Sequence, residues 1–129
     1  SGYCLVNKRS FLAIAFPCLF AACAFGYQAR GQLSDVNGEM RGKAYPANNG
    51  GGRFVLTDQT GVLTCDGLAN APSISLQPGS CDGEQGNGVL RCSDGRVVNF
   101  DWQASSCRSL RGSGSDAQGN RLEFRVERR

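Results

Sequence analysis

The side chains of this chain that could do chemistry are cysteines, acids and arginines, because the sequence contains no histidine. Without an imidazole there is no histidine-based acid or base, no serine–histidine–aspartate triad and no histidine-ligated metal site. A pair of carboxylates is the hydrolytic arrangement left to consider, and Asp94 and Asp101 are the candidates. Their spacing does not predict a shared cleft. We therefore expect no enzyme activity, with a carboxylate-dependent hydrolase as the alternative.

Metal binding is the next chemistry to consider, and neither the cysteines nor the acids have a suitable spacing. A zinc site built on four cysteines favours pairs about two to four residues apart. The nearest pair after the N-terminal region, Cys81 and Cys92, is wider than that. The acids within residues 82–116 lack the spacing of an EF-hand loop, and Asp-Gly is usually a turn. We expect no metal and no cofactor.

The seven cysteines fall into two groups. Cys4, Cys18 and Cys23 lie in or beside an apolar N-terminal run. The other four lie in a glycine-rich region, where they predict two disulfides, because such a set in a short exported domain is typical of a disulfide framework. These four residues are Cys65, Cys81, Cys92 and Cys107.

The N-terminal stretch of residues 8–27 reads KRSFLAIAFPCLFAACAFGY, with a basic start, an apolar run and then small residues. This order is typical of a secretory signal, and the apolar run is short for a membrane span. Its end, LFAAC, resembles a bacterial lipobox, in which a cysteine after small residues is lipidated and becomes the new N-terminus. The resemblance implies a signal peptide over residues 1–22, a lipid on Cys23 and a place in the bacterial cell envelope.

The residue after this cysteine is Ala24 rather than an acid, which in lipoproteins of this class resembles the form sent to the outer membrane. We therefore expect a lipid anchor on the periplasmic side, in the outer membrane rather than the inner one. Two alternatives stay open. One is ordinary secretion after cleavage near Ala22 or Ala24, and the other is an uncleaved membrane anchor.

Downstream of Cys23 the sequence divides into two parts. Residues 23–51 are dense in glycine and asparagine and have weak periodicity, which predicts a flexible tether with room for one short strand. Residues 52–129 contain short runs of β-branched and aromatic residues between turn-forming clusters. These runs are RFVLT, GVLTC, SISL, GVLRC, RVVNFDW and RLEFRV. We predict an all-β domain, an antiparallel meander of about six short strands closed into a small barrel or sandwich-like sheet.

The last two runs indicate which side chains face the core. In each, apolar residues alternate with polar ones, as in a strand with one solvated face. The side chains expected to face inward are Val98, Phe100, Trp102, Leu122, Phe124 and Val126. The aromatic residues among them are therefore interpreted as core rather than as a binding surface.

An internal repeat runs through this domain. Residues 61–87 and 88–113 each contain GVLxC and a second cysteine, and each copy ends in a Gly-x-Gly pair whose second glycine is the next residue. Such repetition predicts stacked strand-and-turn units, with the Gly-x-Gly pairs at turns. It favours one disulfide within each copy, although the other two connectivities stay open. The favoured pairs are Cys65–Cys81 and Cys92–Cys107.

Arginine strongly outnumbers lysine in the exported part, and arginine is common at protein interfaces. The candidate partner-binding residues are Arg91, Arg96, Arg108, Arg111 and Arg125. The chain has a net charge of +3, but Lys8 and Arg9 precede the apolar run, so the part after residue 23 carries only about +1. That charge is too balanced to indicate nucleic-acid binding.

Together these patterns predict a non-enzymatic envelope lipoprotein that acts as a structural or binding accessory subunit of a membrane-associated complex. We expect it to contact the membrane through its lipid and to bind a protein partner, and no small-molecule substrate is indicated. An alternative from another class is a secreted inhibitor or binder of another enzyme. That alternative predicts a rigid exposed loop over residues 68–80.

Overall fold

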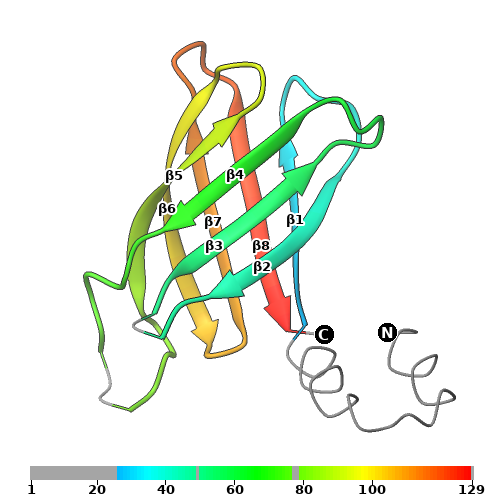
Figure 1. The fold of residues 1–129 in the computed structure, drawn as a ribbon. Helices are drawn as coiled ribbons and strands as arrows, with labels where there is room; N and C mark the ends of the chain where they lie inside the picture. Colours follow the sequence, from blue (N-terminus) through cyan, green and yellow to red (C-terminus); the bar gives the residue numbers. More distant parts are fainter. Residues whose placement is uncertain (1–25, 49, 77–78, 129) are drawn as a thin grey trace, which may run out of the picture.

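A computed structural model describes residues 26–48, 50–76 and 79–128 of the 129-residue chain. Eight antiparallel strands follow one another around a closed barrel (Figure 1). They are β1 (Tyr27–Leu33), β2 (Met40–Pro46), β3 (Gly52–Thr57), β4 (Thr64–Ala69), β5 (Gln85–Cys92), β6 (Val97–Ser106), β7 (Ser109–Ser115) and β8 (Arg121–Arg128). Each strand pairs with the next, and β1 pairs with β8 to close the ring. In the described ranges no helix is long and apolar enough to cross a membrane.

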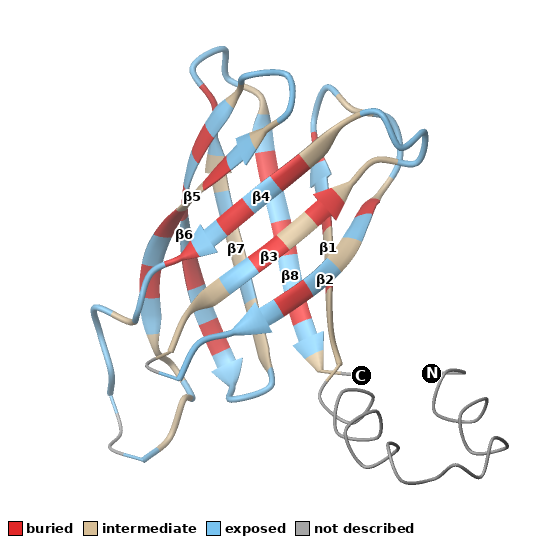
Figure 2. Ribbon diagram, viewed as in Figure 1, coloured by how far each residue is buried: buried red, intermediate tan, exposed pale blue. Residues whose placement is uncertain are grey.

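Buried and exposed side chains alternate along these strands, so one face of each strand packs in the barrel interior and the other faces solvent. In β6 and β8 each buried residue lies between exposed ones, as the sequence predicted (Figure 2). The predicted inward side chains are all buried: Val98, Phe100, Trp102, Leu122, Phe124 and Val126. Burial of apolar surface is the main force that closes such a barrel, at about 25 cal/mol per Å².

Three phenylalanine rings fill the middle of the barrel. Phe54 stacks on Phe124 with ring centroids 4.5 Å apart, and Phe100 meets Phe124 edge-on at 4.8 Å. Aromatic pairs in these arrangements contribute about 0.5–1.5 kcal/mol beyond the area that they bury.

Inward-facing glycines make the room that these rings need. Gly88 lies opposite Phe100 in the register of β5 and β6, and Gly112 lies opposite Phe124 in that of β7 and β8. A Cβ atom at either glycine would lie 2.5 Å from the ring opposite, well inside van der Waals contact. The Gly-x-Gly pairs therefore lie within strands, and the prediction that they form turns is wrong.

The barrel has eight strands where about six were predicted. Five of the six predicted runs contribute to strands, although GVLTC enters β4 only from Thr64. The run SISL does not form a strand, and its Ile74 makes a single bridge to Gln85. The three strands that were not predicted are β1, β2 and β7.

The strands β1 and β2 lie in the stretch predicted as a flexible tether, so that prediction is wrong for residues 27–46. Small residues such as Ala29, Gly31 and Ala44 occupy inward positions there, and the alternation of large apolar residues that marks a strand is missing. Neighbouring large side chains fill the space instead, since a Cβ atom at Gly31 would lie 3.0 Å from the Leu56 side chain.

The four downstream cysteines form two disulfides, as predicted, but they join the two repeat copies to each other. Cys65 bonds to Cys92 and Cys81 bonds to Cys107, so the favoured pairing within each copy is wrong. The physical reason is that β4 and β5, which carry the two GVLxC cysteines, are antiparallel neighbours. Their cysteines face each other in register, with Cα atoms 3.9 Å apart.

The connections between strands divide the barrel into two ends. The end with the loops of residues 34–39, 58–63, 93–96 and 116–120 is called the sealed end. The end with the loops of residues 47–51, 70–84 and 107–108 is called the open end. The start of β1 and the finish of β8 also lie at the open end, side by side in the register of the two strands (Figure 1).

Candidate functional site

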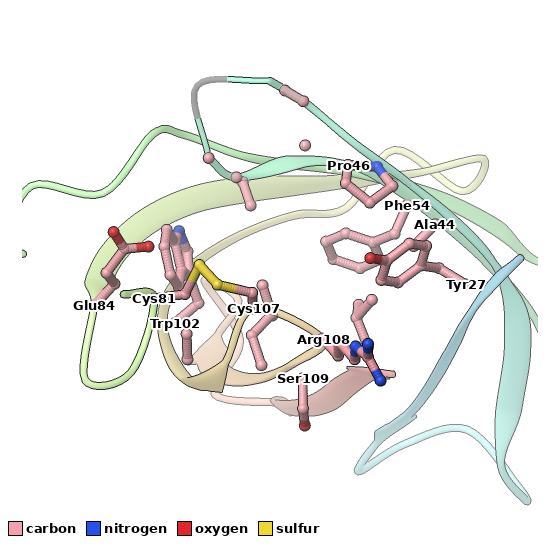
Figure 3. A pocket seen from close by; sticks show the side chains of 18 of the residues that line it. Tyr27, Ala44, Pro46, Phe54, Cys81, Glu84, Trp102, Cys107, Arg108 and Ser109 are labelled. Carbon is pink, nitrogen blue, oxygen red and sulfur yellow. A yellow bond between two sulfur atoms is a disulfide. The ribbon is translucent and has the colours of Figure 1, made fainter. Parts of the chain in front are cut away.

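A cavity of about 220 Å³ lies at the open end of the barrel (Figure 3). Its walls are mainly apolar and come from strands around the ring: Tyr27 of β1, Phe54 of β3, Trp102 of β6, Leu110 of β7 and Val126 of β8. An eight-stranded barrel is wide enough to hold one small ligand when its interior is not filled by side chains.

Small inward residues create this cavity. Ala44, Ala69 and Ala104 line it, whereas Leu33 and Leu56 occupy inward positions toward the sealed end and are completely buried. A closed wall cannot collapse onto the missing side-chain volume, so the space is retained.

The long loop of residues 70–84 borders the cavity and is fixed to the wall at both ends. The Trp102 indole N–H donates a hydrogen bond to the Asn70 carbonyl oxygen at 3.2 Å. The Cys81–Cys107 disulfide attaches the other end of the loop to the turn between β6 and β7. These two contacts hold Asn70 and Cys81 against the wall beside the cavity.

Charged and polar groups at the mouth of the cavity differ in whether they have partners. The Glu84 carboxylate accepts a hydrogen bond from the Ser75 hydroxyl at 3.2 Å. The Arg108 guanidinium and the Tyr27 hydroxyl line the same cavity and have no side-chain partner among the described residues. Figure 3 shows Glu84 and Arg108 on opposite sides of the disulfide.

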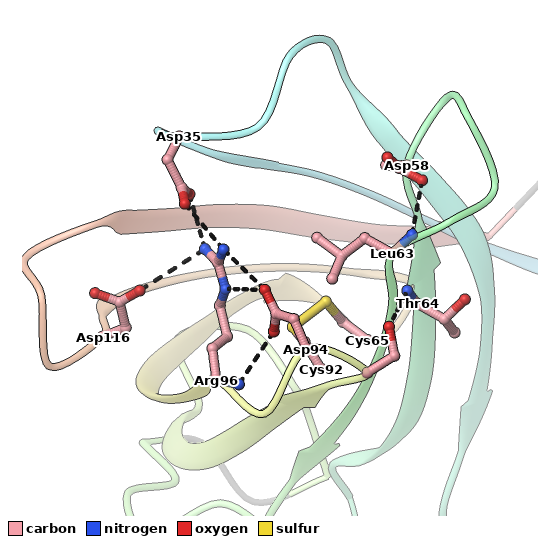
Figure 4. The surroundings of a disulfide bond; sticks show 10 residues. Asp35, Asp58, Leu63, Thr64, Cys65, Cys92, Asp94, Arg96 and Asp116 are labelled. Carbon is pink, nitrogen blue, oxygen red and sulfur yellow. Dashed lines mark hydrogen bonds and ion pairs between the residues drawn. A yellow bond between two sulfur atoms is a disulfide. The ribbon is translucent and has the colours of Figure 1, made fainter.

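Arg96 occupies the sealed end and connects three loops (Figure 4). Its Nη1 and Nη2 donate to the two carboxylate oxygens of Asp35 at 2.7 and 2.9 Å. Its Nε donates to Asp94 at 3.2 Å, and its Nη1 lies 3.7 Å from a carboxylate oxygen of Asp116. The Arg96 side chain is only 14% exposed, whereas the side chains of Asp35 and Asp94 remain partly exposed. We call these four residues the Arg96 network.

The Arg96 network shifts the pKa values of its members. The hydrogen bond from the Arg96 guanidinium lowers the pKa of Asp35 below its ordinary value of 3.8, and the Arg96 backbone N–H is the largest cause of the lowered pKa of Asp94. The Asn120 amide has this role for the pKa of Asp116. The pKa of Arg96 is raised, mainly by its hydrogen bond to Asp35. At neutral pH all four groups are charged, and each carboxylate has a partner.

Four arginines form a row across the outer wall, one on each of four neighbouring strands. In register, Arg41 of β2 lies opposite Arg30 of β1, Arg30 opposite Arg125 of β8, and Arg125 opposite Arg111 of β7. We call this set the arginine row. A shallow hollow of about 620 Å³ lies over the wall at Arg30, Arg111 and Arg125.

Acidic neighbours neutralise the arginine row only in part. Arg41 contacts Glu39 at 3.1 Å, and Arg125 lies 3.9 Å from Glu127. The side chains of Arg30 and Arg111 have no ion-pair or hydrogen-bond partner within the described part of the chain. Like charges directly opposite each other in a sheet are unfavourable, so the fold does not require this arrangement.

The structure separates the five arginines predicted to bind a partner. Arg96 is taken up by the Arg96 network, and Arg108 lies at the mouth of the cavity. Arg111 and Arg125 belong to the arginine row, while Arg91 faces outward from β5, on a different part of the wall. These five side chains do not form a common surface.

The two carboxylates considered for hydrolysis are not brought together. Asp94 lies in the turn between β5 and β6 and is bound by Arg96, whereas Asp101 lies within β6 opposite Asn87 and Ser113. No group of three or more side chains suited to a metal ion occurs in the described residues.

Sequence reasoning missed several residues of these surfaces. Tyr27, Arg30 and Arg41 lie in the stretch interpreted as a tether, and Leu110 lies in the unpredicted β7. The signal that could have indicated Arg30 is the alternation of Gln28, Arg30 and Gln32 with Ala29 and Gly31. This signal is weak because alanine and glycine lack the large apolar side chains that usually mark the inward face of a strand.

Comparison of the chain with models of protein families, with curated proteins and with solved structures found no match. The predicted signal peptide over residues 1–22 and the lipidated Cys23 lie outside the described residues and stay predictions.

Proposed function

We propose that this chain is a non-enzymatic lipoprotein of the bacterial cell envelope that binds an acidic protein surface as an accessory subunit of a membrane-associated complex. The observation that supports binding is the arginine row, which places four positive charges in register across β2, β1, β8 and β7. Like charges directly opposite each other in a sheet are destabilising. A carboxylate-rich partner would offset this cost and gain charge-assisted hydrogen bonds.

The anchor places the barrel relative to the membrane in this proposal. Cys23 lies four residues before Tyr27, where β1 begins at the open end. Four residues span at most about 14 Å, so a lipid on Cys23 holds the open end close to the bilayer. The arginine row runs around the side wall, where a neighbouring subunit in the same membrane can reach it. Two disulfides agree with an oxidising compartment outside the cytoplasm.

The anchor is tested by expressing the full chain and a Cys23→Ser variant in a bacterium with a labelled fatty acid. We expect label and membrane association in the wild type, and neither in the variant. An unlabelled wild-type protein that fractionates like the variant would overturn the lipoprotein proposal.

Partner binding is tested by crosslinking in the envelope with two matched double variants. Arg30→Gln with Arg111→Gln removes the unpartnered charges of the arginine row. Arg53→Gln with Arg91→Gln removes two charges elsewhere on the wall, of which Arg53 is ion-paired with Asp66 at the surface. We expect the crosslinked partner to be lost only with the first pair, and to weaken with rising salt. Equal retention in both variants would contradict the role of the row. Unfolding of both variants should stay cooperative, because no buried group changes.

A second candidate, a secreted binder of another enzyme, is favoured by one observation. The loop of residues 70–84 carries Ile74 and Leu76 at 46% and 65% exposure, and a disulfide fixes its C-terminal part. Exposed apolar side chains on a constrained loop are typical of a docking element. Release of the wild type into the medium, together with binding lost in an Ile74→Ser/Leu76→Ser variant, would favour this candidate.

A further inference from the structure

The cavity at the open end combines apolar walls with unpaired hydrogen-bond donors. Phe54, Trp102 and Leu110 supply apolar surface, and the first two are almost fully buried. The Arg108 guanidinium and the Tyr27 hydroxyl have no side-chain partner among the described residues. This combination suits a molecule with an aliphatic body and an anionic head.

The charge at the mouth is not symmetric, and this fixes the orientation of such a molecule. Glu84 lies across the disulfide from Arg108 and is engaged by the Ser75 hydroxyl (Figure 3). An anionic head is therefore repelled from the Glu84 side and attracted to the Arg108 side. A cationic head would instead be attracted to the Glu84 side of the mouth.

We propose that the cavity binds an aliphatic carboxylate of about eight carbons, with the chain against Trp102 and Phe54 and the carboxylate at Arg108 and Tyr27. The volume of 220 Å³ equals about seven water molecules at about 30 Å³ each, and a methylene group is of similar size. Chains up to this length fit inside, and longer chains extend past the mouth. Binding in the cavity requires neither the lipid anchor nor the arginine row.

Octanoate is the probe, and Trp102 is the reporter. Trp102 is the sole tryptophan of the sequence and lines the cavity, so its fluorescence reports on occupancy. We expect a saturable change in its emission on titration with octanoate. The affinity should increase about fourfold for each methylene from hexanoate to octanoate and then level off, because each buried methylene contributes a similar transfer free energy.

The head group is tested with octan-1-ol and with an Arg108→Gln variant. Octanoate should bind about fivefold more weakly to Arg108→Gln, as expected for a partly exposed charge pair, while octan-1-ol binds both proteins equally. Arg91→Gln, which removes a charge from the wall of β5, is the matched control and should leave octanoate binding unchanged.

The location is tested with Ala44→Leu, which fills part of the cavity and should weaken both probes. Absence of a saturable change with octanoate would overturn the proposal. Equal binding of octanoate by the wild type and Arg108→Gln would overturn the carboxylate orientation. This second comparison stands even if Ala44→Leu does not fold.

Discussion

At the sealed end of the barrel, Arg96 lies among three carboxylates, above completely buried residues such as Leu33 and Leu56. At the open end, Arg108 has no side-chain partner among the described residues and stands beside a cavity lined by alanines. Both ends carry an arginine and a disulfide. The difference lies in whether neighbouring groups satisfy the arginine and whether large side chains fill the interior behind it. We infer that the sealed end carries stability and the open end carries binding capacity.

The disulfides give the largest expected effect. Their sequence separations of 27 and 26 residues predict about 3.5 kcal/mol of stabilisation each from the constrained unfolded chain. Cys65 is also completely buried in the core, so Cys65→Ala/Cys92→Ala should lose about 1 kcal/mol more than Cys81→Ala/Cys107→Ala. Urea unfolding measures both values. A greater loss for the open-end pair would reverse the assignment of stability to the sealed end.

Removing the charge of Arg96 is expected to cause the second-largest loss of folding stability. Arg96→Gln leaves three carboxylates close together without their cation, and we expect a loss of about 2 kcal/mol in the free energy of unfolding. This value is below that of a fully buried pair because the Asp35 and Asp94 side chains are 38% and 42% exposed. Thermal unfolding measures it, with Arg91→Gln as a control that should change little. A loss as small as that of the control would show that the network is only a surface feature.

Acid should weaken the sealed end in particular. The pKa values of Asp35 and Asp94 are lowered in the folded protein from an ordinary 3.8, so their contribution is complete well above that value. It is lost as the pH falls through 3.8 and on through the lower folded values, because the unfolded chain then binds more protons. Melting temperatures from pH 6 to pH 2.5 should therefore fall less steeply in Arg96→Gln than in the wild type. Parallel curves would mean that other carboxylates cause the acid sensitivity.

Neutralising Arg108 gives the smallest expected effect on folding. Because its guanidinium has no side-chain partner among the described residues, Arg108→Gln should change the free energy of unfolding by less than about 0.5 kcal/mol. The same urea measurement as for Arg96→Gln gives the direct contrast between the two ends. A loss comparable to that of Arg96→Gln would show that both arginines are structural.

The strands that sequence reasoning identified are those with large inward side chains. β6 and β8 alternate Val98, Phe100, Leu122 and Phe124 with polar residues, and period two is visible there. In β7 the corresponding inward positions include Gly112, whose missing side chain is replaced in space by a ring from the next strand. When side chains of neighbouring strands fill the core beside a strand, the sequence of that strand shows no apolar alternation.

The surfaces were harder to predict than the strands because they depend on contacts between distant residues. Asp35 and Arg96 are 61 positions apart and meet only when the barrel closes. The disulfide pairing depends on β4 and β5 being neighbours, which an alignment of the two repeat copies does not reveal. The composition drew attention to arginine, but the five arginines that it grouped lie on separate surfaces.

The two ends of the barrel chain lie next to each other, so the direction in which the barrel points from an attachment surface can be changed without changing its fold. Tyr27 and Arg128 are register partners, so whatever precedes the first or follows the second joins the barrel at the same end. A circular permutant that links these two residues and opens the loop of residues 58–63, where Val62 is 79% exposed, would keep the same ring of strands. Tethered through its new ends, the same barrel would stand inverted, with its cavity directed away from the attachment surface.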